Sequence, residues 1–180
     1  MAAATTDLMA AATKVRDALR DGDYEALAAM VSPDENVAFD RFGMDIDLGP
    51  DYVHEPIRLS PQEISQLEQD AWSAVYTWEG YGEPTKTSFA EYLDSFVWDR
   101  DYDDAPYVTV DDYHSGDADL DPGPPNVAED FGPTAHWVEY CFPAPGEGEG
   151  ETALYLVFRE TATGYYLIGI INSQWTHGAG

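Results

Sequence analysis

Residues 152–171 read TALYLVFRETATGYYLIGII, and this stretch decides the fold class. Two runs of β-branched and aromatic residues, 152–160 and 164–172, flank Thr161-Ala162-Thr163-Gly164, a sequence typical of a tight hairpin turn. Residues 135–142 form a third run of the same kind. The sequence therefore predicts three successive antiparallel strands near its C-terminal end.

The last two predicted strands are apolar on both faces. Because successive side chains of a strand point to opposite faces, alternation places Leu154, Leu156 and Phe158 on one face and Tyr155 and Val157 on the other. In the next strand it places Tyr166, Ile168 and Ile170 opposite Leu167 and Ile171. We expect helices to cover one face, and either a partner chain or the N-terminal segments to cover the other. This pattern favours a homodimer.

The first half of the chain has the helical period. In residues 7–20, apolar side chains recur every three or four positions, which predicts an amphipathic helix. Asp21-Gly22-Asp23 ends that helix and caps a second one, about 23–31. Short strands are predicted at Val37-Phe39 and Tyr52-Val53.

Two further helices carry start signals. Ser60-Pro61, with Glu63 three residues after the serine, predicts a helix that runs to about Ser73. Thr87 or Ser88 caps a helix over about 88–97. A strand is predicted at 106–113, and the glycines and prolines of 115–134 predict an acidic loop.

Helices followed by antiparallel strands predict an α+β fold in which N-terminal helices pack on a curved sheet. The absence of a long linker favours a single domain over residues 1–180, with a core over roughly 7–176.

The charge of the chain excludes several classes of function. Thirty-five acidic and eight basic residues give a net charge of −27. Without a basic patch, binding to nucleic acid is excluded and docking on anionic membranes is disfavoured. No apolar run approaches the ~18 residues of a membrane span. Because the carboxylates are spread along the chain, we interpret them as the surface of a salt-adapted protein; a basic partner or Ca²⁺ is the competing interpretation.

Cys141 is the only cysteine, so no intramolecular disulfide is expected. It lies in an apolar run, which favours a buried small side chain over a catalytic thiol. The first twelve residues lack the pattern of a signal peptide. The sequence as written therefore suggests a cytoplasmic protein, or an extracytoplasmic one if a leader has been removed.

Two stretches resemble a known superfamily. Residues 18–33 (ALRDGDYEALAAMVSP) resemble the opening helices of the nuclear transport factor 2-like superfamily, whose fold is the cystatin-like cone. Residues 154–171 resemble its closing hairpin. The resemblance implies a pocket between the helices and a concave sheet, which serves enzymes and plain binding proteins alike.

A narrower resemblance is to a group of uncharacterised bacterial proteins that are often lipoproteins. It rests on residues 87–92 (TSFAEY), 96–99 (FVWD) and 169–176 (GIINSQWT). The chain departs from that group in its acidic, proline-rich 115–134 loop and in lacking a lipid-attachment cysteine near its start. The group implies no particular activity.

An enzyme of this fold would need a carboxylate or histidine base in an apolar pocket. Glu139 is the first candidate, and His136, three residues earlier, falls on the opposite face of the strand. The expected pocket-lining donors are Tyr92, Trp98, Tyr140 and Trp175. The competing interpretation makes Glu139 the partner of Arg159 in a cross-strand ion pair.

Metal and cofactor signals are weak. Asp99-x-Asp101-x-Asp103 lacks the glycine and the glutamate of an EF-hand, so we reject it. Asp117, Asp119 and Asp121 form a weak candidate for Ca²⁺, and the histidines lack zinc-like spacing. No nucleotide or hydrolase motif occurs, and no cofactor is expected.

The sequence thus favours a non-enzymatic module from a salt-adapted organism that binds an unknown small ligand or protein. The alternative is a small-molecule isomerase or lyase that uses Glu139 or His136 as its base. A calcium-responsive surface protein is the third hypothesis.

Overall fold

The computed structural model of the chain describes residues 2–42, 56–67, 75–77, 85–114, 125–144 and 151–174. Its main sheet has six strands in the order β2-β1-β8-β7-β6-β5. The strands are β1 (Val37–Phe42), β2 (Ile57–Leu59), β5 (Tyr107–Val110), β6 (Ala135–Phe142), β7 (Thr152–Thr161) and β8 (Gly164–Gln174). A separate ribbon pairs β3 (Val75–Thr77) with β4 (Thr85–Thr87).

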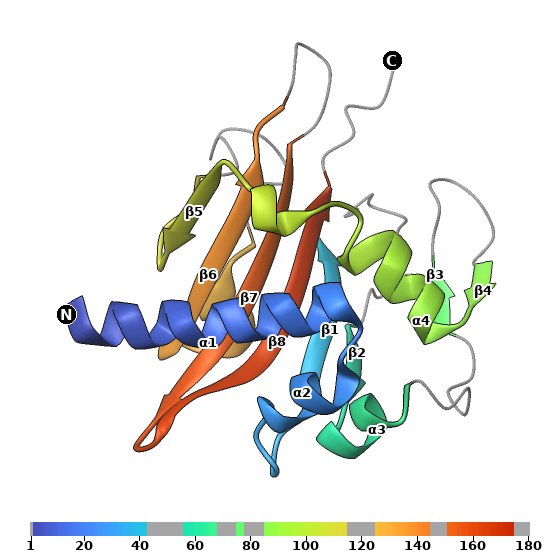
Figure 1. The fold of residues 1–180 in the computed structure, drawn as a ribbon, viewed down its shortest axis with the longest axis horizontal. Coiled ribbons are helices and arrows are strands. Elements are labelled where there is room, and N and C mark those ends of the chain that lie inside the picture. The colour runs from blue at the N-terminus through green and yellow to red at the C-terminus, as the bar shows by residue number, and fades with distance from the viewer. Residues whose placement is uncertain are drawn as a thin grey trace.

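Helix α1 (Ala2–Asp21) lies across one face of the curved sheet (Figure 1). This arrangement confirms the α+β class with N-terminal helices on a curved sheet. The sheet is mixed rather than wholly antiparallel, because β1 runs parallel to β8. The single-domain organisation over 1–180 stays a prediction.

The shorter helices follow their capping residues. They are α2 (Tyr24–Ala29), α3 (Pro61–Ser65), α4 (Phe89–Tyr92) and α5 (Val127–Phe131), with a π-helix at Leu93–Val97 and a 3₁₀ turn at Tyr102–Asp104. Ser60 and Ser88 both form the capping box that their sequences predict. Gly22 takes the left-handed conformation, with a φ of +65°, that ends α1.

The sequence prediction was wrong in several places. Helix α3 ends at Ser65, short of the predicted Ser73; residues 68–74 lie outside the described part of the chain. Residues 127–131 of the predicted loop form α5, because the Asn126 side chain accepts a hydrogen bond from the backbone N–H of Glu129 and caps it. The predicted strand at Tyr52-Val53 lies outside the described residues.

The two faces of the sheet carry separate hydrophobic clusters. The first packs α1 on the sheet and includes Leu8, Val15, Val138, Leu156 and Ile170. The second lies on the opposite face and comprises Val127, Ala135, Cys141, Ala153, Tyr155, Val157, Ile168 and Ile171. The burial of Cys141 confirms its prediction as a core side chain.

Helix α5 covers part of the second face. Its Phe131 ring packs so closely on Gly169 that a Cβ there would lie 2.5 Å from the ring. Tyr113 and Trp137 pack on the same cluster, so segments of the chain itself cover at least part of this face. The homodimer stays a prediction.

A β-bulge corrects the predicted faces of β8. Val157 pairs with Gly169 and Phe158 with Leu167, which leaves Ile168 without a direct partner. The extra residue reverses the alternation beyond it. Ile168 and Ile170, predicted on one face, therefore lie in different clusters.

Candidate functional site

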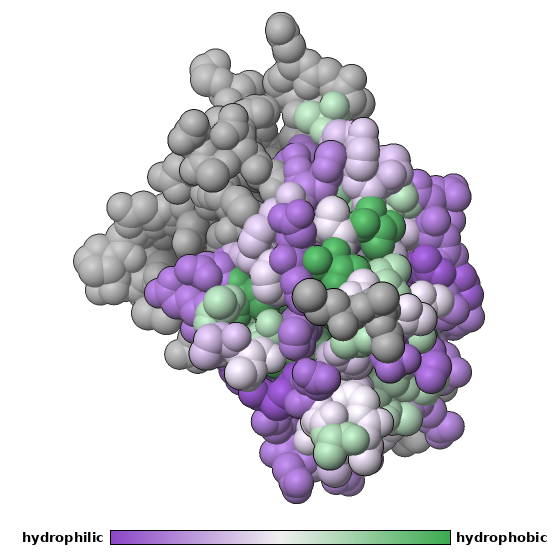
Figure 2. Space-filling model, turned by 90° about the vertical axis from the view of Figure 1, so that its left-hand side faces the viewer, coloured by the Kyte–Doolittle hydropathy of each residue, from purple (hydrophilic) through white to green (hydrophobic). Residues whose placement is uncertain are grey.

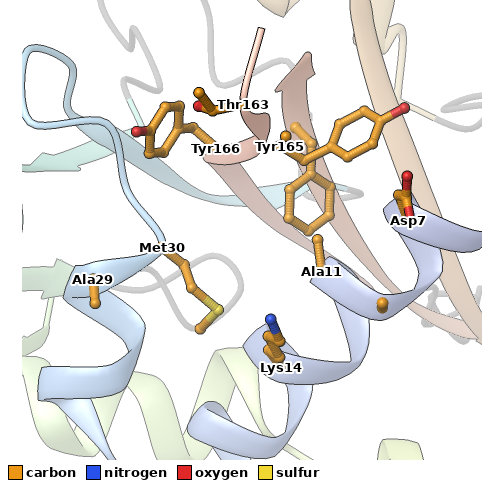
Figure 3. A pocket seen from close by; sticks show the side chains of 11 residues that line it. Asp7, Ala11, Lys14, Ala29, Met30, Thr163, Tyr165 and Tyr166 are labelled. Atoms are coloured by element: carbon orange, nitrogen blue, oxygen red, sulfur yellow. The ribbon is translucent and has the colours of Figure 1, made fainter. Parts of the chain in front are cut away.

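A cavity of about 490 Å³ lies between α1, the end of α2 and the β7–β8 hairpin (Figure 3). We call it the α1–hairpin groove. Its described lining consists of Asp7, Ala10, Ala11, Lys14, Ala29, Met30, Phe158, Thr163, Gly164, Tyr165 and Tyr166. The volume falls within the ~300–1,000 Å³ of small-molecule sites.

Helix α1 supplies one wall because it has two stripes. Leu8, Ala12 and Val15 are buried against the sheet. Asp7 and Lys14 flank that stripe and line the groove. Since alanines occupy the positions between them, the helix leaves open space beside its own backbone.

The opposite wall is held by backbone pairing. The N–H of Leu167 donates to the carbonyl of Met30 at 2.9 Å, and Val31 bridges to Leu167, so the end of α2 is fastened to β8. The Thr161 hydroxyl donates to the Gly164 carbonyl at 2.9 Å and closes the hairpin turn. In Figure 3 the Met30 side chain extends toward Lys14, and the Tyr165 ring lies beside Asp7.

The charges of the groove are not neutralised by neighbours, unlike those of the adjacent arginines. Arg16 and Arg20 both form ion pairs with Asp103, at 2.6 and 2.5 Å. By contrast, within the described part of the chain Lys14 and Asp7 form no ion pair. On the face of the molecule shown in Figure 2, hydrophilic side chains surround small hydrophobic patches.

Glu139 is fully buried, but not beside the groove. Its carboxylate accepts hydrogen bonds from the Tyr155 hydroxyl (3.1 Å) and the backbone N–H of His114 (2.5 Å), and the Thr109 hydroxyl lies 2.8 Å away. Its neighbours in β6, Val138 and Tyr140, belong to the cluster under α1, so Glu139 faces the opposite side of the sheet.

The predicted pairing of Glu139 with Arg159 is wrong. In the β6–β7 register Glu139 lies opposite Tyr155, and Arg159 lies opposite Ala135, four residues away. Arg159 instead forms an ion pair with Glu35 at 3.2 Å.

His136 lies on the same face of β6 as Tyr140, opposite to Glu139, as alternation predicts. Its Nδ1 lies 2.8 Å from an Asp111 carboxylate oxygen, and its ring meets that of Tyr165 edge-on at 5.9 Å. His136 therefore contacts Tyr165, which lines the groove, but does not line the groove itself.

The other predicted site residues are distributed through the core. Tyr92 stacks on Phe89 with ring centroids 5.4 Å apart. Tyr140 is buried below Arg16, whose guanidinium carbon lies 5.7 Å from the ring centroid, and burial raises the pKa of the Tyr140 hydroxyl. None of these predicted residues lines the groove, so their pocket role stays a prediction. Trp175 lies outside the described residues.

Trp98 adjoins a buried polar cluster where the π-helix meets β8. Its ring meets Tyr102 edge-on at 5.3 Å. The Tyr102 hydroxyl donates to Asp99 at 2.7 Å, and the Asn172 amide donates to both Tyr102 and the carbonyl of Val97. Burial first, and the Asp99 carboxylate second, raise the pKa of Tyr102. The cluster fastens residues 97–102 to β8.

The described residues contain no group of three or more His, Cys, Asp or Glu side chains placed to hold a metal ion. The candidate calcium ligands Asp117, Asp119 and Asp121 lie outside those residues, so that hypothesis stays a prediction. Among the described helices, none has the length and apolar character that a bilayer crossing requires.

Sequence reasoning missed the groove. Asp7, Ala10, Ala11 and Lys14 share one side of α1, and that spacing is visible in the sequence. Their approach to Tyr165 is not visible, because it depends on how far the β7–β8 hairpin extends past the helix.

Comparison with known proteins yields matches only among solved structures. No family model and no curated protein matches the chain. A cystatin-like domain of unknown function from Nostoc punctiforme has 13% identity and a TM-score of 0.41, covering 97% of this chain and 79% of that one. An NTF2-like protein with a cystatin-like fold from Novosphingobium aromaticivorans has 12% identity and a TM-score of 0.37, covering 98% and 90%.

A third structure, from Streptomyces avermitilis, is described as a candidate dehydratase of the NTF2-like family. It has 15% identity and a TM-score of 0.32, with coverage of 97% and 99%. At these identities no function is transferred from any of the three. All three carry the NTF2-like or cystatin-like description. At TM-scores below 0.5 they assign no superfamily to this chain, so the NTF2-like resemblance and the narrower lipoprotein-like resemblance both stay predictions.

Proposed function

We propose that the protein is a non-enzymatic binding module whose ligand occupies the α1–hairpin groove. One observation carries this proposal. The space between α1 and the sheet is filled by the first hydrophobic cluster, whereas the groove beside α1 is open. It is lined by a cation and an anion that form no ion pair with any described residue. Ligand sites use placed polar groups to orient the ligand beside apolar side chains, and the groove offers both.

The position of Glu139 supports binding over catalysis. A general base must come within about 3 Å of the proton that it removes. Glu139 is fully buried and lies on the sheet face opposite α1, whereas the groove lies on the α1 side. For the alternative, an isomerase or lyase, Glu139 would need a second opening on its own face of the sheet, and no feature of the described residues favours one. His136 lies on the α1 side and contacts Tyr165, but it does not line the groove.

Adaptation to high salt is part of the same proposal. A charge of −27 destabilises the folded chain by self-repulsion when salt is low. The described arginines that form ion pairs neutralise only a few of the 35 acidic side chains.

The binding proposal is tested with a fragment library and ligand-observed NMR. Ala10 is exposed and lines the groove, so Ala10→Trp would fill it without disturbing the core. Ala26→Trp, at an exposed position of α2 outside the groove, is the matched control. Fragments that bind the wild type and Ala26→Trp but not Ala10→Trp would support the proposal. An unchanged set of binders in Ala10→Trp would contradict it.

A further inference from the structure

The two charged groups of the groove stand two helical turns apart. Asp7 and Lys14 are seven residues apart in α1, which corresponds to a rise of about 10.5 Å. Figure 3 shows both side chains projecting from α1 on the same side, Asp7 toward Tyr165 and Lys14 toward Met30. The groove thus presents a negative end and a positive end along a single axis.

The middle of the groove carries small, aromatic and thioether side chains. Ala10 and Ala11 form the helix side between the two charges, and Met30, Phe158 and Tyr165 lie around them. Small residues beside aromatic and thioether groups favour an apolar body at least as large as an aromatic ring. A complementary ligand therefore has an apolar centre and opposite charges at its ends.

The net charge of the protein also limits which ligands the groove can attract. An anion would approach against the field of −27 charges, and a simple cation would be attracted to many carboxylates without needing Lys14. A ligand without net charge is not repelled, and a zwitterion can use Asp7 and Lys14 together. The chain has two lysines and 35 acidic residues, and Lys14 forms no ion pair among the residues that the structure describes, so it is well placed for a carboxylate from outside the chain.

The separation of the charges sets the length of the ligand. Three extended residues span at most about 10–11 Å. That span matches the rise between Asp7 and Lys14.

We infer that the α1–hairpin groove binds a short peptide of about three residues, with its terminal carboxylate at Lys14, its terminal ammonium at Asp7 and an apolar side chain between them. This inference rests on the proposed function, because it assigns a ligand class to the same groove.

The test uses the full chain and the peptide Ala-Phe-Ala in four forms: free, N-acetylated, C-amidated and blocked at both ends. Affinities are measured by NMR titration at the lowest KCl concentration that gives complete folding by circular dichroism. We expect the free peptide to bind most tightly. Each block should weaken binding by about two- to fivefold, the range of a partly exposed ion pair.

Single variants test which end of the peptide each charged side chain contacts. Lys14→Gln should remove the effect of C-amidation and leave that of N-acetylation, and Asp7→Asn should do the converse. Arg58→Gln and Asp34→Asn change the net charge equally at exposed positions outside the groove, and they should alter neither effect.

The outcomes separate this inference from the proposed function. Equal affinity for all four peptide forms would overturn the assignment of the charges. If no form binds while fragments still bind in a way that Ala10→Trp abolishes, the peptide inference fails and the proposed function stands. If neither peptides nor fragments bind the groove, both fail.

Discussion

Replacing Glu139 by glutamine tests whether this buried carboxylate serves the fold. The substitution keeps the shape of the side chain but replaces one acceptor oxygen with an NH₂ group. The carboxylate holds the Tyr155 hydroxyl at 3.1 Å and the His114 N–H at 2.5 Å, with the Thr109 hydroxyl at 2.8 Å. The NH₂ group of glutamine therefore faces either the buried Tyr155 hydroxyl or the part-buried His114 N–H and Thr109 hydroxyl, and those donors lose their acceptor.

An unsatisfied buried donor costs about 1–3 kcal/mol, and hydrogen bonds to charged groups lie in the same range. We therefore expect the free energy of unfolding of Glu139→Gln to fall by about 1–3 kcal/mol. With a urea m-value of about 2 kcal/mol/M, the midpoint should fall by roughly 0.5–1.5 M. Urea is the suitable denaturant because guanidinium chloride would itself screen the surface charge.

A control variant corrects for the change in net charge that Glu139→Gln also causes. Removing any carboxylate from a chain with a net charge of −27 lowers self-repulsion and can stabilise the fold. Glu25→Gln removes the same charge at an exposed position, so the difference between the two variants isolates the buried contacts. If the free energies of unfolding of Glu139→Gln and Glu25→Gln agree within about 0.5 kcal/mol, the buried carboxylate does not stabilise the fold through these donors.

Three further predictions concern packing, the thiol and salt. Gly169→Ala should lower the free energy of unfolding by about 1–3 kcal/mol through overpacking, because the added Cβ would lie 2.5 Å from the Phe131 ring. The loss should be smaller in a Phe131→Ala background. If urea unfolding shows that the effects of the two substitutions simply add, Gly169 and Phe131 are not in contact. Burial raises the pKa of the Cys141 thiol to about 12, so at pH 8 an aromatic disulfide reagent should label it in urea and scarcely at all in the native state; rapid native labelling would show an exposed thiol. The melting temperature should rise steeply from low salt to molar KCl, since the Debye length falls to about 3 Å, and a flat response would remove the salt-adaptation proposal.

Local signals predicted much of this fold. The strand predicted over 135–142 coincides with β6, and the turn at residues 161–164 closes β7 on β8. The two serine capping boxes form as predicted, because each depends on side chains only three residues apart.

The departures arise from effects that local patterns do not contain. The bulge at Ile168 reverses which face the following side chains occupy, although the alternation of the sequence continues unbroken. Helix α5 lies in a glycine- and proline-rich window and is stabilised by Asn126 and by packing on Gly169. Strands β2, β3 and β4 each have three residues, too few to show a period.

The candidate site was predicted least well. Glu139 stands out in the sequence as an acid in a hydrophobic strand, and the structure buries it among donors from its own chain. The α1–hairpin groove depends on bringing together residues more than 140 positions apart, such as Asp7 and Tyr165. No spacing along the chain reports such a contact.

The most direct test of the account is a methyl and backbone NMR map of the protein with any ligand that it binds. A ligand in the α1–hairpin groove should shift the signals of Lys14, Met30 and Tyr165 and leave those of Tyr140 and Leu154, beneath α1, in place. Shifts centred on the buried residues Tyr140, Leu154 and Glu139 instead would show that the ligand binds within the core against the sheet, and would contradict the assignment of the groove.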